Sequence, residues 1–226
     1  MQSHDRGRAC PVGDLRRGGP QRVAGLATDR ESGCRWRRTS QRAGGPAMTR
    51  AVAWSVALRG QVAEPFSVTA VLGSAAPVDT GHAQETPECR DRVRAALLNS
   101  GRPWPHTAVQ LSMNGAPQPS AIADLAVAVA VLAASGQCRS ILLPKVLFVA
   151  ELGLDGSLRQ VEGTWAAFDA APLLGFTHAV VPQSVLPEFG PATALTAVGA
   201  PTLTEVLYWL HGTHELPCAG THRWDL

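Results

Sequence analysis

The positions of hydrophobic and polar residues from about residue 48 to residue 212 predict a series of short strands separated by helices. Runs rich in valine and alanine with polar interruptions are typical of strands. Such runs occupy residues 52–58, 66–72, 106–113, 146–152, 158–161, 177–181 and 193–198. Residues 154–157 read Leu-Asp-Gly-Ser, and the Asp-Gly pair predicts a tight hairpin between two of these strands.

Four segments predict helices, because their apolar residues recur on one face or because they are too long and too rich in alanine for strands. They are residues 87–100, 120–135, 164–170 and 203–211. Thr86 and Pro87 suit the start of the first helix, and Thr202 with Glu205 forms a capping box before the last. Strands and helices interleave without strict alternation, so the pattern predicts α and β layers around a mixed sheet.

The first 47 residues show no apolar periodicity and carry eight glycines, three prolines and ten arginines. Such a composition cannot bury a core, so residues 1–47 are expected to form a disordered extension. A basic arm for nucleic acid and an arginine-rich transit peptide are alternatives, although four acidic residues argue against the second. The simplest interpretation is an upstream extension with no selected structure, with Met48 as the working start.

Charge and cysteine content narrow the classes of protein that remain. Residues 1–47 carry a net charge of +6 and residues 48–226 carry −4, which together give the overall +2. The predicted domain therefore offers no broad basic surface for nucleic acid. Five dispersed cysteines without a C-x-x-C pair suggest a reducing compartment. The N-terminus has no apolar signal region and the longest apolar run, residues 125–134, is too short to span a bilayer, so we expect a cytoplasmic protein.

The chain contains one lysine, Lys145, and this restricts its chemistry. A nucleotide-binding P-loop places a lysine after a glycine-rich turn, whereas Lys145 follows Leu143 and Pro144. A Ser-Lys catalytic dyad needs a lysine beside the serine to accept its proton. Lys145 is the sole candidate for that role, and it stands at the start of a predicted apolar strand.

Three segments resemble the N-terminal domain of the ComM/YifB proteins, the magnesium-chelatase-like group. Residues 91–101 read DRVRAALLNSG and resemble its first helix, and Asp124-Leu125 with LAASGQ at 132–137 resembles its central helix. Residues 148–159 read FVAELGLDGSLR and resemble its hairpin, although Ala150 replaces a glycine. The resemblance covers about residues 48–212. It implies an α+β fold of the ribosomal protein S5 domain 2-like type, with a mixed sheet packed with helices.

The family's domain is similar to the proteolytic domain of Lon, and this implies a place for a nucleophile. Lon-like enzymes carry a serine in a turn that opens the central helix, where this chain has Pro119-Ser120-Ala121. Ser120 is therefore the weak catalytic candidate, although counting back from Gly136 puts Ala121 at the position itself. A serine there is also an ordinary helix cap. The family's lysine position, fourteen residues after Glu151, holds Trp165, which cannot accept the proton.

A second candidate site lies near the C-terminus, in residues 213–226 and the end of the last helix. His211, His214, Cys218 and His222 are of the types that bind zinc, but their spacing matches no standard finger. We expect a flexible tail without a metal. Arg90 and Arg94, one helical turn apart, are weak candidates for binding phosphate or an acidic partner, although neighbouring acidic residues neutralise them.

The sequence therefore predicts a catalytically silent domain without cofactor. In full-length ComM-like proteins an AAA+ ATPase follows this domain, and those proteins act as hexameric DNA branch-migration helicases. The resemblance implies a role in protein interaction or regulation, with a separate AAA+ ATPase subunit or further copies as partners in DNA processing, or else a remnant of such a protein. The alternatives are a Lon-like serine hydrolase that uses Ser120 and a zinc-binding module formed by the tail.

Overall fold

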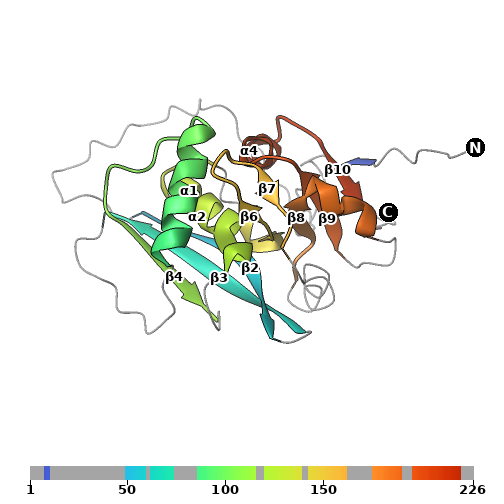
Figure 1. The fold of residues 1–226 in the computed structure, drawn as a ribbon, viewed down its shortest axis with the longest axis horizontal. Coiled ribbons are helices and arrows are strands. Elements are labelled where there is room, and N and C mark those ends of the chain that lie inside the picture. The colour runs from blue at the N-terminus through green and yellow to red at the C-terminus, as the bar shows by residue number, and fades with distance from the viewer. Residues whose placement is uncertain are drawn as a thin grey trace, which may run out of the picture.

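The structure, a computed structural model, describes residues 8–10, 49–59, 62–73, 86–115, 120–138, 142–161, 175–189 and 195–219. Its main element is an eight-stranded sheet in the order β1-β10-β9-β8-β5-β2-β3-β4 (Figure 1). The strands are β1 (Arg8–Cys10), β2 (Thr49–Arg59), β3 (Val62–Leu72), β4 (Val109–Asn114), β5 (Val146–Phe148), β8 (His178–Pro182), β9 (Thr196–Ala200) and β10 (Leu216–Ala219). Two further strands, β6 (Glu151–Leu152) and β7 (Leu158–Arg159), form a separate hairpin.

The sheet is mixed, as the sequence predicts. Strands β2, β5, β8 and β9 run parallel to one another, whereas β3 and β4 continue the sheet antiparallel on one side and β10 and β1 on the other. Each residue of β8 and β9 is buried, which is typical of parallel strands covered on both faces. In β4 the buried residues alternate with partly exposed ones, because there only one face meets the core.

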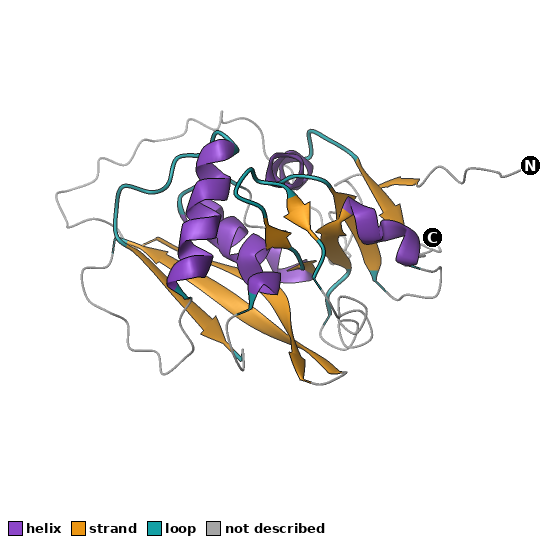
Figure 2. Cartoon of the chain, in the orientation of Figure 1, coloured by secondary structure: helices purple, strands orange, loops and turns teal. Residues whose placement is uncertain are grey.

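Helix α2 (Asp124–Ala134) forms the centre of the core, with ten of its eleven residues buried. Figure 2 shows α1 (Pro87–Asn99) and α2 on the same side of strands β2, β3 and β4. This confirms the interpretation of the alanine- and valine-rich segment as a buried helix rather than a strand. A helix surrounded by apolar side chains needs no polar face.

The predicted ends of the first and last helices are confirmed, whereas the central helix begins at Asp124 rather than at residue 120. The Thr86 hydroxyl accepts a hydrogen bond from the Cys89 amide at 3.2 Å, and Pro87 occupies the first turn of α1. The Thr202 hydroxyl accepts from the Glu205 amide at the start of α4 (Leu203–His211). Gly212 ends α4 with a φ of 75°, a left-handed conformation that glycine adopts without strain.

The predicted strand at 146–152 is divided in the structure. β5 ends at Phe148, and the chain leaves the sheet before β6 begins at Glu151. Between them the Val149 amide still donates to the Val180 carbonyl at 2.9 Å, but the Ala150 carbonyl accepts from the Leu125 amide in α2 at 3.2 Å. The Ala150 carbonyl, which would bond to a neighbouring strand if β5 continued, therefore bonds to α2 instead. The hydrophobic periodicity of the sequence does not predict this break in the strand.

The two ends of the chain differ from expectation. Within residues 1–47, expected to be disordered, Arg8–Cys10 forms β1, and within the tail 213–226, expected to be flexible, Leu216–Ala219 forms β10. Main-chain pairing to an existing sheet edge stabilises such short strands without any side-chain pattern. The predicted helix at 164–170 lies outside the described residues. No helix in the described part of the chain is long and apolar enough to cross a membrane.

Candidate functional site

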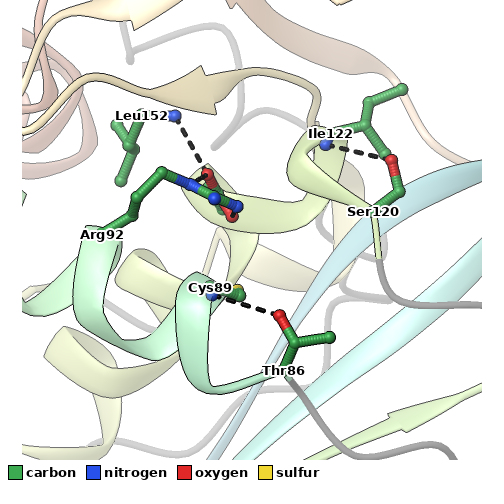
Figure 3. Close-up of polar contacts among 7 residues, drawn as sticks. Thr86, Cys89, Arg92, Ser120, Ile122 and Leu152 are labelled. Carbon is green, nitrogen blue, oxygen red and sulfur yellow. Dashed lines mark hydrogen bonds and ion pairs between the residues drawn. The ribbon is translucent and has the colours of Figure 1, made fainter.

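At the start of the central helix, where a Lon-like nucleophile would lie, the chain forms a turn held by hydrogen bonds (Figure 3). Ala121–Ala123 form a 3-10 turn that leads into α2. Ser120 is exposed and extended, and its hydroxyl accepts a hydrogen bond from the Ile122 amide at 3.4 Å. From β2, the buried Ser55 hydroxyl donates to the Ile122 carbonyl at 3.3 Å. Ser120 therefore serves as a helix cap in this geometry.

A buried ion pair lies directly behind this turn. Asp124, the first residue of α2, is fully buried, and its two carboxylate oxygens accept from the Arg92 guanidinium at 2.8 and 3.2 Å. The Leu152 amide of the β6–β7 hairpin donates to the same carboxylate at 3.4 Å (Figure 3). A carboxylate at a helix N-terminus is further stabilised by the helix dipole. One side chain thus connects α1, α2 and the hairpin.

The electrostatics agree with this arrangement. The hydrogen bond to Asp124 raises the pKa of the Arg92 guanidinium, against the opposing effect of burial. The Arg92 side chain keeps 30% of its surface exposed, whereas that of Asp124 keeps none. The carboxylate of the pair is therefore fully enclosed by the protein, whereas the Arg92 side chain is partly in contact with solvent. Its bidentate form adds directional specificity to the charge attraction.

Lys145 lies away from Ser120. It ends the 3-10 turn Leu143–Lys145 immediately before β5, and its side chain is exposed. The start of α2 is bonded at the other end of this segment, through the Ala150 carbonyl. β5 and Val149 therefore separate Lys145 from the residue that the start of α2 contacts. In the described part of the chain, the Lys145 amine makes no hydrogen bond or ion pair.

The zinc candidates that the structure describes do not form a metal-binding group. His211 lies in the last turn of α4, His214 is exposed between α4 and β10, and Cys218 is half-buried in β10. His222 and Trp165 lie outside the described residues. Across the residues that the structure describes, no group of three or more His, Cys, Asp or Glu side chains is arranged to hold a metal ion.

Arg90 and Arg94, the candidates for an anion site, have different surroundings in the structure. Both terminal nitrogens of Arg90 donate to the Val109 carbonyl at 3.2 Å, which ties α1 to the first residue of β4. Arg94 is exposed on the outer face of α1. The functional interpretation of the two as one anion site therefore has no support in this geometry.

Sequence reasoning missed Arg92 and Asp124 as a pair. Thirty-two residues separate them, and the sequence offers for Arg92 the nearer partner Glu88, one helical turn away. The one available signal was an acidic residue at the first position of an otherwise apolar helix. A carboxylate about to be buried needs a cation, and the arginines of the preceding helix were the candidates.

Comparison with known proteins identifies the family. The model of the family described as subunit ChlI of Mg-chelatase matches residues 80–185, which include α1, α2 and the β6–β7 hairpin. An uncharacterized protein of Mycobacterium tuberculosis is 36% identical over 171 residues, covering 73% of this chain and 34% of that protein. The competence protein ComM of Haemophilus influenzae is 31% identical over 177 residues, covering 76% of this chain and 35% of ComM. This chain carries a ComM/YifB-family domain.

The YifB protein of Escherichia coli extends the same comparison, with 34% identity over 131 residues, which cover 57% of this chain and 26% of that protein. The chain spans about a third of the length of the first curated relatives it matches. Within the ComM/YifB-family domain, the matched region contains the capping serine, the ion pair and the hairpin amide together. The start of α2 is therefore its best-defined polar site.

Proposed function

We propose that this ComM/YifB-family domain is catalytically silent and acts in protein interaction or regulation. Its proposed partner is an AAA+ ATPase subunit, or further copies of the chain, in a cytoplasmic process of DNA handling. The fold we propose is of the ribosomal protein S5 domain 2-like type. A mixed sheet that places two helices over one face of β2, β3 and β4 supports this classification.

The observation that carries the proposal is the state of Ser120. A nucleophilic serine needs a base within hydrogen-bond reach to take its proton. In the described part of the chain, the Ser120 hydroxyl has one partner, the Ile122 amide, which is a donor and cannot accept a proton. Lys145 stands at the far end of β5, and the family's lysine position holds Trp165 in the sequence.

The ion pair behind Ser120 supports the same proposal. Both carboxylate oxygens of Asp124 are engaged by Arg92, and the Leu152 amide adds a third bond. An acid or base in catalysis must exchange a proton with a substrate, whereas this carboxylate is fully buried and bonded. The group nearest the helix start is thus suited to holding three elements together.

Labelling with a fluorophosphonate probe tests the silent assignment. We expect the purified protein to remain unlabelled under conditions that label an active serine hydrolase added to the same tube. Ser120→Ala and Ser184→Ala, which change two exposed serines, provide the matched pair of variants. Labelling of the wild type that disappears in Ser120→Ala but persists in Ser184→Ala would establish a hydrolase and end this proposal.

Co-purification from the native cell tests the interaction role. A tagged chain expressed at its normal level is expected to bring down an AAA+ ATPase subunit or untagged copies of itself. Tagged Arg92→Met, which disturbs the anchored hairpin, is expected to recover less partner at equal amounts of bait. Recovery of the bait alone, by mass spectrometry after crosslinking, contradicts the interaction role without bearing on catalysis.

A further inference from the structure

Strand β1 lies at one end of the main sheet and pairs only with β10 among the described strands (Figure 1). The pairing is antiparallel and three residues long, with Arg8 opposite Cys218, Ala9 opposite Pro217 and Cys10 opposite Leu216. On its other side β10 pairs with β9. Without β1, the outer backbone groups of β10 would form an open sheet edge.

We infer that Arg8–Cys10 is a cover strand that prevents β10 from pairing with the β10 of a second copy of this chain. An open edge presents unpaired N–H and C=O groups that recruit another strand. Main-chain bonds supply the affinity in such pairing, so an arginine- and glycine-rich segment without an apolar pattern can still occupy the edge. This assigns a role to a part of the chain that its composition marks as featureless, and it rests on the form of the proposed function in which the partner is an ATPase subunit.

A second copy is the occupant that β10 itself favours. Natural edge strands are commonly guarded by charged side chains, especially lysine. The four residues of β10 are Leu216, Pro217, Cys218 and Ala219, and none carries a charge. Two identical uncharged strands can pair antiparallel across a two-fold axis, so that each edge closes the other. The backbone nitrogen and carbonyl of Pro217 face β9 in this register, so the outer edge keeps the N–H and C=O groups of Leu216 and Cys218.

The cover is also removable. A three-residue strand at an edge contributes few hydrogen bonds, each of modest net value. The cover strand therefore blocks association only while it is paired, and its loss changes the oligomeric state and leaves the core intact.

The test measures molar mass by light scattering and sedimentation over a wide concentration range, under reducing conditions. The full chain is expected to stay monomeric, and a variant lacking residues 1–47 is expected to approach twice its monomer mass. Within the full chain, Cys10→Pro removes the backbone donor that faces Leu216 of β10 and should have the same effect as the deletion. Ala27→Pro, in the same N-terminal segment but outside β1, is the matched control and should remain monomeric.

Two further measurements locate the contact. A synthetic peptide of residues 5–14, added to the truncated protein, should return it to the monomer mass by occupying β10 in trans. Ala219→Lys in the truncated protein should also prevent association, because a lysine on an edge strand opposes its pairing with another strand. Far-UV circular dichroism and a melting curve verify that each variant is folded.

Several results overturn the inference. A folded truncated protein that stays monomeric at all concentrations shows that β10 needs no cover. Association that persists in Ala219→Lys, or that the peptide leaves unchanged, places the contact elsewhere. If the truncated chain does not fold, Cys10→Pro in the full chain decides the question, and a monomeric Cys10→Pro variant excludes the cover role.

Discussion

Replacing Arg92 by methionine provides a direct test of the ion pair at the start of α2. Methionine keeps much of the apolar length of the side chain and removes the guanidinium. The Asp124 carboxylate, which has no exposed surface, then retains a single hydrogen bond, from the Leu152 amide at 3.4 Å. The perturbation therefore leaves a charge buried without a counterion.

The size of the effect follows from that burial. Removing one partner of a buried ion pair costs about 3–5 kcal/mol, and the 30% exposure of Arg92 places this pair at the lower end, about 3 kcal/mol. For a chain of this size, that loss lowers the melting temperature by roughly 6–12 °C. Urea unfolding followed by circular dichroism, extrapolated linearly to water, gives the free energy of unfolding directly.

Two variants make the reasoning refutable. Arg94→Met removes an exposed arginine from the same helix and should change the free energy of unfolding by no more than about 0.5 kcal/mol. Arg92→Met with Asp124→Asn keeps an acceptor for the hairpin amide but no charge, and should recover about 1–2 kcal/mol of the loss. If Arg92→Met and Arg94→Met destabilise equally, the buried pair does not contribute as described.

Three further outcomes are expected. Burial raises the pKa of the Cys138 thiol to about 12, so iodoacetamide at mildly alkaline pH should modify it only in urea, as peptide mass spectrometry can verify. Gly156→Ala should cost about 2 kcal/mol in urea unfolding, because φ is +83° and the new methyl would meet the Ser100 hydroxyl. Hydrogen bonds from the Ser157 hydroxyl and amide lower the pKa of Asp155 below its usual 3.8. The stability that these bonds contribute is present above pH 3.8 and is lost as the pH falls through the lowered pKa. Ser157→Ala removes the hydroxyl bond and should raise the pKa of Asp155, as an NMR titration of the carboxyl group can measure.

Local patterns accounted for the elements that depend on local interactions. The caps at Thr86 and Thr202, the hairpin turn at residues 154–157 and the burial of α2 all agree with the structure. Each rests on contacts within a few residues or on the apolar content of a continuous run. The same reasoning placed Ser120 at the start of the central helix, where it is a cap.

The candidate site was less predictable, because its partners are distant in sequence. Arg92 and Asp124 are 32 residues apart, and Leu152 lies a further 28 residues beyond Asp124. Helical spacing offered Glu88 as the partner of Arg92, yet an exposed pair of that kind contributes only a few tenths of a kcal/mol. Burial of the carboxylate decides the pairing, since a desolvated charge needs a counterion and an exposed one does not.

The sequence by itself determined the family, the strands and helices of the core, the helix caps and the absence of a P-loop. Only the tertiary structure decided that the segment after β5 leaves the sheet, that Arg92 pairs with Asp124, and that Arg8–Cys10 and Leu216–Ala219 become strands. The reason is physical. Local pattern reports the interactions a segment makes with itself, whereas edge pairing and charge burial depend on which distant groups the fold brings within hydrogen-bond distance.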